Sequence, residues 1–318
     1  MKKILLIVVA IVVVVVAAAL IVPFLIPTDT YKQQIARQVR NATGRELTIG
    51  GDLSLSLLPR VQFTAGQVRL ANAGWADDDT MARFERMQVR VDPMALLSGT
   101  LRIDSFVLTE PVINLAKRAD GTANWQFEGM GGTPETGGAP ADGGAPSDGG
   151  DAAGGGIGPL TDIGLNDVRL VDGTITYSDA ASGQSYRFEN VDLSLALSGL
   201  DAPLTAEGNA TWNGETVALE LETGPPRQLM AGEPTQVVAD VQSEPITLSF
   251  DGDVTNAEQR KIAGEVDLDV ASVKRLAAWT GTPIDAPEGT LEAFNLQGTV
   301  DATGPTYRFA AQSIVFDK

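Results

Sequence analysis

The sequence has no cysteine and no histidine among its 318 residues, and aromatic residues make up only 6% of it. Without cysteine the chain forms no disulfide, and without either residue it has no thiol nucleophile, no histidine base and no Cys/His zinc site. The low aromatic content predicts a core built mainly from aliphatic side chains. These absences exclude several common kinds of catalytic and metal site.

Sequence patterns of other enzyme classes are missing as well. No serine stands in a Gly-x-Ser-x-Gly motif, and no Gly-Lys pair marks a phosphate-binding loop. The acidic stretches at 77–79 and 250–255 are attributed to polar turns, because the second has its glycine at the wrong place for an EF-hand loop. We therefore expect a protein that is not an enzyme, with no catalytic residue, no metal site and no cofactor.

The formal net charge of −18 is unevenly distributed. Residues 1–128 contain 14 Lys and Arg against 12 Asp and Glu, a net charge of +2, whereas residues 129–318 contain 9 against 29, a net charge of −20. An acidic half of this kind argues against nucleic acid as a partner, because nucleic acid requires a basic surface. The simplest role of the acidity is solubility.

The N-terminus predicts a membrane anchor. Lys2 and Lys3 precede 23 uncharged residues, Ile4 to Ile26, which as a helix would span about 34 Å and cross a hydrocarbon core of about 30 Å. A cleaved signal peptide is the alternative, but the apolar run continues well past the small residues 17–19. We expect residues 1–27 to form a cytoplasmic tip and a single transmembrane helix, with the rest of the chain exported.

Residues 28–128 are expected to hold an amphipathic helix and a first β segment. Tyr31, Ile35 and Val39 recur every four residues and predict a helix over about 29–43. From about residue 46 apolar and polar residues alternate, which is typical of strands with one apolar and one polar face.

The apolar residues of these strands form a candidate lipid-binding face. Its predicted members are Leu53, Leu55, Leu57, Phe63, Leu70, Met87, Val89, Val91, Leu101, Ile103, Phe106 and Leu108. Three short helices, at about 29–43, 93–98 and 272–280, are too few to cover the predicted strands, so a second sheet or a ligand must do so. From the residues alone a closed β-sandwich and a groove filled by acyl chains both stay open. Each buried methylene contributes about 0.8 kcal/mol, so a lipid tail needs no polar motif.

The second half repeats part of the first. Residues 129–158 include 13 glycines and predict a flexible linker or loop, and residues 159–318 form a second β segment. A fixed displacement of 62 residues relates a strand–turn–strand unit in the two segments, which is typical of stacked, elongated architectures. The corresponding residues are Phe106, Leu108, Glu110, Ile113 and Leu115 in the first unit and Val168, Leu170, Asp172, Ile175 and Tyr177 in the second.

With these features the chain resembles the AsmA family of Gram-negative bacteria, relatives of the bridge-like lipid transfer proteins. The resemblance rests on the N-terminal span and on the segments "PTDTYKQQIARQVRNATGRELTIGGDLSLSLLPRVQF", "VRLANAGWADDD", "MQVRVDPMALLSGTLRIDSFVLTEPVINLAKRADGTANW" and "GEVDLDVASVKRLAAWTG". It implies a mainly β fold, in which a single N-terminal transmembrane helix precedes an elongated, curled antiparallel β-sheet groove with few short helices. The last residues lie within a strand pattern, so we expect the chain to be the N-terminal part of a longer member.

The resemblance also implies a location and a function. The protein is expected in the bacterial inner membrane as a single-pass protein, with its N-terminus in the cytoplasm and its bulk in the periplasm. Its expected function is that of a lipid-binding or lipid-transfer scaffold for outer-membrane lipid homeostasis and assembly. The expected partners are membrane phospholipids, with inner- and outer-membrane proteins as further candidates. The alternative is a non-lipid assembly factor that aids outer-membrane protein biogenesis through its strand edges.

Overall fold

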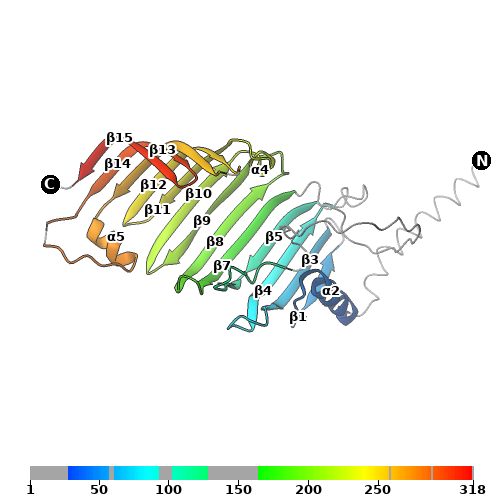
Figure 1. Ribbon diagram of the computed structural model, residues 1–318. Helices are drawn as coiled ribbons and strands as arrows, with labels where there is room; N and C mark the ends of the chain where they lie inside the picture. Colours follow the sequence, from blue (N-terminus) through cyan, green and yellow to red (C-terminus); the bar gives the residue numbers. More distant parts are fainter. Residues whose placement is uncertain are drawn as a thin grey trace, which may run out of the picture.

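Within its described residues, the computed structural model is one large sheet with three helices beside it (Figure 1). The sheet is elongated and curled, and the fold is mainly β with few short helices, as expected. No helix in the described part of the chain is long and apolar enough to cross a bilayer. The expected span at 1–27, the helix at 93–98 and the Gly-rich segment at 129–158 lie outside the described residues. The described residues are 28–56, 61–92, 102–127, 164–257, 259–287 and 289–316.

Fifteen strands form the sheet. Those before the Gly-rich segment are β1 (Leu47–Ile49), β2 (Leu53–Ser56), β3 (Val61–Ala71), β4 (Thr80–Val91), β5 (Ile103–Thr109) and β6 (Val112–Lys117). Those after it are β7 (Leu165–Asp179), β8 (Gln184–Leu197), β9 (Leu204–Trp212), β10 (Glu215–Thr223), β11 (Thr235–Gln242), β12 (Ile246–Thr255), β13 (Lys261–Val270), β14 (Phe294–Thr303) and β15 (Thr306–Phe316). From β7 to β15 each strand pairs with the next, whereas β7 also pairs with both β5 and β6.

The sheet is mixed, so the expectation of an antiparallel sheet was wrong in one respect. β5 and β6 pair with β7 in parallel, and the other pairs are antiparallel. The cause is the 62-residue repeat, whose two units lie side by side in register, with Phe106 opposite Val168 and Ile113 opposite Ile175. Two copies that run in the same direction require a long crossover connection. The chain between β6 and β7 is that connection.

Along a line from β3 to β8 the alternation of inward and outward side chains shifts by one residue. We call this line the crease. At the crease Gln67, Glu110, Asp172 and Asn190 have positive φ angles of 48° to 54°, a conformation that costs a non-glycine residue about 1 kcal/mol. Gln67, Asp172 and Asn190 each reverse the alternation of their strand, and Glu110 does so between β5 and β6. As a result Ala65 and Val68, three residues apart on β3, are 0% and 2% exposed, although an unbroken strand would place them on opposite faces.

Glycines allow β12 and β13 to approach each other closely. Gly252 and Gly264 stand opposite each other on β12 and β13, and the ring of Phe250 lies over both of them. A Cβ at Gly264 would lie 2.5 Å from the Asp251 carbonyl oxygen and 2.9 Å from Cε2 of Phe250. These two positions have no room for a side chain.

The three helices contact only parts of the sheet. The predicted amphipathic helix is present as α2 (Thr28–Thr43) and packs against β1 and β2. The sequence did not predict α4 (Pro226–Met230), which contacts β11. The predicted second helix is α5 (Val273–Trp279), and Ser272 accepts a hydrogen bond from the Arg275 amide at its N-cap.

Aromatic and charged contacts fix α5 at the ends of the strands. The rings of Trp279 and Trp212 meet edge to face with centroids 4.6 Å apart, and Trp279 Nε1 donates a hydrogen bond to the Trp212 carbonyl. Arg275 donates hydrogen bonds to Glu215, the first residue of β10, and to Glu244 in the β11–β12 turn. Arg275 holds the pKa of Glu244 below its usual range. The helix therefore joins β13 to two other strand connections.

Replacing Gly264 with alanine should lower the free energy of unfolding by about 1–3 kcal/mol, because the added methyl group displaces a backbone carbonyl and the Phe250 ring. Urea unfolding of the purified protein measures the change. The matched control is Gly74→Ala, where a Cβ meets no atom within 4 Å and the change should stay within about 0.5 kcal/mol. Equal effects of the two substitutions would contradict the close approach of β12 and β13.

Replacing Trp279 with alanine should release α5 while the strands stay folded. An aromatic pair of this kind contributes about 0.5–1.5 kcal/mol, so amide hydrogen exchange over residues 273–279 should become roughly two- to tenfold faster. Hydrogen-exchange mass spectrometry measures it, with Met230→Ala as the control because that side chain is 72% exposed. Unchanged exchange in α5 would show that Trp279 does not fix the helix.

Candidate functional site: the inner face of the sheet

One face of the sheet is apolar from β2 to β14. Residues directly opposite each other on paired strands share a face, so the register follows this face from strand to strand. One row of it reads Leu55, Phe63, Val89, Phe106, Val168, Leu195, Ala206, Leu221, Ala239, Phe250 and Val266. The row continues through Gly298 on β14 to Ala311 on β15. We call the face that carries this row the inner face.

The predicted lipid-binding residues that the structure describes all lie on the inner face. Leu53 and Leu55 on β2 stand opposite Ala65 and Phe63 on β3. The next strands continue the same rows with Met87, Val89 and Val91 on β4 and Ile103, Phe106 and Leu108 on β5. Leu70 lies on the same face beyond the crease, opposite Leu47 and Ala82. Leu57 and Leu101 lie outside the described residues. Whether these residues bind lipid stays a prediction.

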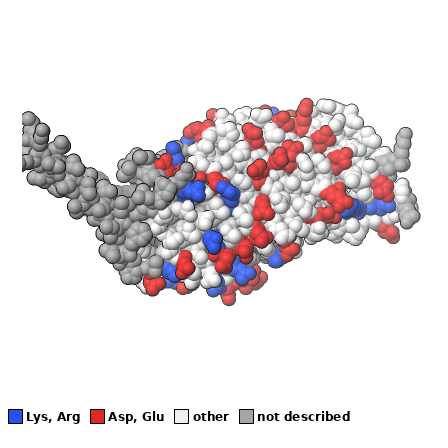
Figure 2. Space-filling view, turned by 180° about the vertical axis from the view of Figure 1, so that it is seen from behind, with Lys and Arg blue, Asp and Glu red and all other residues white. Residues whose placement is uncertain are grey.

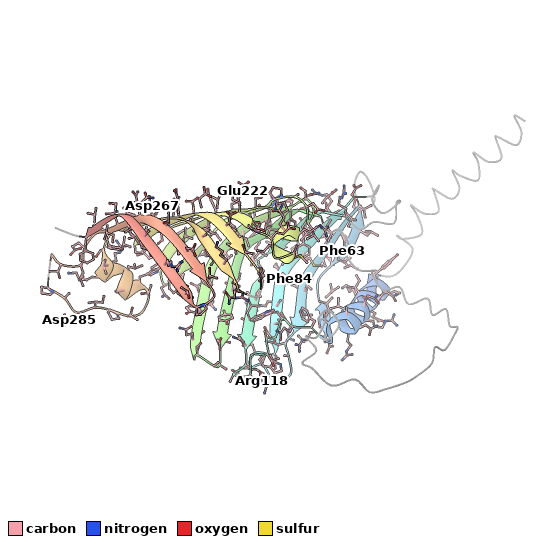
Figure 3. All side chains as sticks on the ribbon, turned by 45° about the horizontal axis from the view of Figure 1, so that its top comes forward. Phe63, Phe84, Arg118, Glu222, Asp267 and Asp285 are labelled. Carbon is pink, nitrogen blue, oxygen red and sulfur yellow. The ribbon has the colours of Figure 1, made fainter. Side chains whose placement is uncertain are left out.

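The opposite face, here called the outer face, is polar and becomes acidic toward the C-terminal strands. Glu207, Glu220 and Asp240 stand directly opposite one another on β9, β10 and β11. In Figure 3 the side chains of Glu222 and Asp267 project outward from the curved sheet, whereas Phe63 and Phe84 lie on its inner side. Figure 2 shows acidic side chains over most of the view from behind, and basic ones mainly toward the first strands.

No second layer of protein covers the inner face within the described ranges. All fifteen strands belong to a single sheet, so the face has no partner sheet. Most of its large side chains are half-buried, and Leu55 is 38% exposed. Few of its large apolar side chains are fully enclosed; two that are enclosed are Val68 and Val270, each 2% exposed. The inner face is therefore an open apolar surface within a curled sheet.

Aromatic residues line one margin of the inner face. This margin lies at the end of β7, the start of β8 and the end of β9. The ring centroids of Trp125, Tyr177, Tyr186 and Trp212 follow one another at 6.2 to 6.3 Å, and Trp279 of α5 ends the series. We call these five residues the aromatic rim. Strand alternation alone does not predict that these rings come together.

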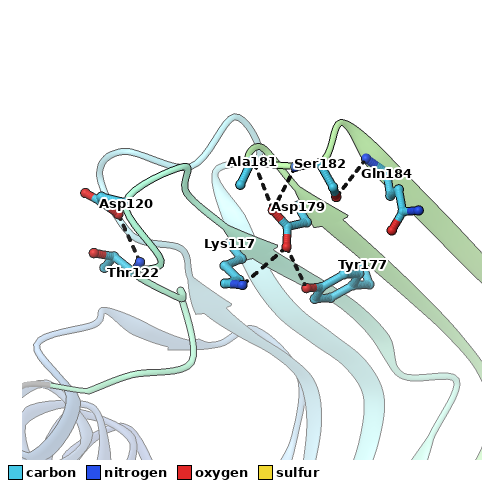
Figure 4. A network of polar contacts seen from close by, with 8 residues as sticks. All are labelled: Lys117, Asp120, Thr122, Tyr177, Asp179, Ala181, Ser182 and Gln184. Carbon is cyan, nitrogen blue, oxygen red and sulfur yellow. Dashed lines mark hydrogen bonds and ion pairs between the residues drawn. The ribbon is translucent and has the colours of Figure 1, made fainter. Parts of the chain in front are cut away.

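A small polar network lies just beyond the aromatic rim (Figure 4). Asp179 accepts hydrogen bonds from the amides of Ala181 and Ser182, from Lys117 Nζ at 3.3 Å and from the Tyr177 hydroxyl at 3.4 Å. The amide of Ala181, followed by Lys117, holds the pKa of Asp179 below its usual range. The side chain of Lys117 remains 37% exposed. The network thus places a fixed anion and an accessible cation at the end of the apolar surface.

The opposite margin of the inner face is aliphatic. The register places six residues in its outermost row, which are Val61, Val91, Ile103, Leu165, Leu197 and Leu204. We call this row the aliphatic rim. The contrast between the two rims was not predicted, because single-strand alternation shows which residues share a face but not which strand ends come together.

The chemistry available at the inner face is that of binding. Among the described residues no group of three or more carboxylates is placed to hold a metal ion. An apolar surface of this kind holds apolar ligands by burial, without directed hydrogen bonds.

Comparison with known proteins gives one match. No curated protein and no solved structure matches the chain. The model of the AsmA family matches residues 1–299 of the 318, which include the predicted anchor, the inner face through β14 and both rims. The chain therefore belongs to the AsmA family.

Proposed function

We propose that the protein is a lipid-handling scaffold whose inner face holds phospholipid acyl chains. The observation that carries the proposal is the unbroken apolar register from β2 to β14, which has no covering sheet in the described part of the chain. Membership of the AsmA family agrees with this function. Acyl chains would cover the inner face, and each methylene buried there would contribute about 0.8 kcal/mol to the binding free energy.

The mechanism is passive. Acyl chains lie on the inner face while headgroups stay in water, and no covalent step takes place. The protein is in this proposal not an enzyme and needs no cofactor. Direction and energy come from other membrane proteins at its two ends.

The proposed location follows from the uncharged run at the N-terminus. A span at residues 4–26 would hold the chain in the inner membrane with its N-terminus in the cytoplasm. The sheet would then stand in the periplasm, where a groove for acyl chains contributes to outer-membrane lipid homeostasis and assembly.

Photo-crosslinking in the native membrane tests the proposal. A photoreactive residue at Leu55 or Phe63, which stand opposite each other on the inner face, should yield adducts with phospholipid. The matched controls are Ser54 and Gln62, adjacent residues of the same strands that face the other way. Mass spectrometry of the adducts identifies the attached molecule.

Lipid adducts restricted to Leu55 and Phe63 would support an acyl-chain surface. Adducts only with other residues of the protein would mean that polypeptide covers the inner face, and the lipid proposal would fail. Equal lipid labelling at Ser54 and Gln62 would also contradict it, because both faces would then merely touch the membrane.

A second candidate function, assembly of outer-membrane proteins, is supported by β15. This strand pairs with β14 alone within the described residues, and all of its residues are exposed, with Tyr307 at 75% and Ile314 at 59%. An exposed strand edge is a template for another strand. Deletion of the gene distinguishes the two functions, since loss of outer-membrane protein insertion with an unchanged lipid distribution would favour this one.

A further inference from the structure

The inner face changes from apolar to polar toward one rim in three neighbouring strands. Three rows of paired residues show the change, starting with the apolar row Ile113, Ile175 and Phe188. The next row is Leu115, Tyr177 and Tyr186, and the last is Lys117, Asp179 and Gln184. At the other end of the same sheet the outermost row is the aliphatic rim. The two margins of the groove therefore differ in polarity.

This order of side chains matches the order of chemical groups along a phospholipid. Tyrosine and tryptophan favour the zone between hydrocarbon and water, because each has an apolar ring and a polar tip. In the structure these rings separate aliphatic side chains from the charged pair of Lys117 and Asp179. A lipid has its glycerol esters in the same place, between its acyl chains and its phosphate.

The distance from the aromatic rim to the crease also fits. Between Tyr177 and Asp172 on β7 the strand covers five residues, or about 17 Å at 3.3 Å per residue. Half of a bilayer core, the depth of one acyl chain, is about 15 Å. Acyl chains that begin at the aromatic rim therefore reach the crease and point on toward Leu165 at the aliphatic rim.

We propose that the aromatic rim is the site where a phospholipid in the groove holds its glycerol and phosphate, with its acyl chains directed toward the aliphatic rim. Lys117 Nζ contacts the phosphate. One of its three N–H donors points to Asp179 at 3.3 Å, and the side chain is 37% exposed, so it reaches solvent at the end of the apolar surface. This inference rests on the proposed lipid-handling function and adds the orientation of the lipid to it.

Two photoreactive positions on one strand test the orientation. In the full-length protein in native membranes, a benzoylphenylalanine replaces Tyr186 at the aromatic rim or Leu193, an inner-face residue seven positions along β8 toward the aliphatic rim. Arg187, which neighbours Tyr186 and faces outward, is the control. Fragmentation of each lipid adduct by mass spectrometry shows which carbon of the lipid was attacked.

Attack near the glycerol from position 186, together with attack on distal methylenes from position 193, is the expected result. The same distribution from both positions, or the reverse order, would overturn the orientation while leaving the lipid-handling function intact. Absence of lipid adducts at Leu193, Leu55 and Phe63 would instead overturn the proposed function, and the orientation with it.

Charge variants test the role of Lys117 separately. Lys117→Glu should reduce the yield of glycerol-proximal adducts from position 186 about threefold, which is the size of an exposed charge contact, while the yield from position 193 stays unchanged. Lys117→Gln should give a smaller loss, and it guards against misfolding of the glutamate variant beside Asp179. Lys261→Glu, on the outer face of β13, is the matched control. Equal yields in all three variants would overturn the phosphate contact.

Added glycerophosphate distinguishes a lipid headgroup from free phosphate. A site for intact lipid should keep its adducts at position 186 when glycerophosphate is in excess, because the acyl chains supply most of the binding energy. Loss of the adducts at 186 with retention at 193 would show that the rim binds the phosphate group independently of the lipid, against the proposal.

Discussion

The structure depends on one constraint: a single curled sheet keeps one face apolar across strands that are far apart in the sequence. The alternation of each strand supplies that face locally, and the register joins it from Leu55 on β2 to Val266 on β13. Two departures from regular strand geometry preserve it. Left-handed residues such as Gln67 and Asp172 reset the alternation at the crease, and Gly252 and Gly264 let two strands approach where the Phe250 ring lies over them. The face maintained at this cost has no covering layer in the described residues.

The 62-residue repeat explains how two segments of the chain form one sheet. Its units pair in parallel, so chemically similar residues come to lie side by side, and even polar partners are 62 residues apart, as in Ser105 with Asp167 and Lys117 with Asp179. Because corresponding residues of the two units pair with each other, the apolar face is extended. The same pairing brings the tyrosines and the charged pair to one margin. The polarity difference between the two rims is thus a consequence of the repeat.

The face that each strand turns inward could be predicted from the sequence. The pairing direction, the crease and the aromatic rim could not, for physical reasons. Alternation identified the inward side of Leu53, Phe63, Met87 and Phe106 correctly, because the period of a strand is a local property. It could not reveal that β7 pairs with β5 in parallel, since pairing direction depends on contacts across 60 residues. Nor did it indicate the crease, because Gln67 and Glu110 are ordinary residues whose left-handed conformation is imposed by the surrounding sheet. The aromatic rim was missed for the same reason: Trp125, Tyr186 and Trp279 come together only in three dimensions.

The central claim is that lipid, and not protein, covers the inner face. The most direct measurement is the amount of phospholipid that co-purifies with the full-length chain in two matched double variants. Phe106→Asp with Leu195→Asp changes the inner face, whereas Val107→Asp with Ser194→Asp changes the outer face of the same strands. Thermal unfolding of each variant checks that it remains folded. The account predicts that a folded inner-face variant loses its bound phospholipid and that the outer-face variant retains it; equal amounts of lipid in the two folded variants would contradict it.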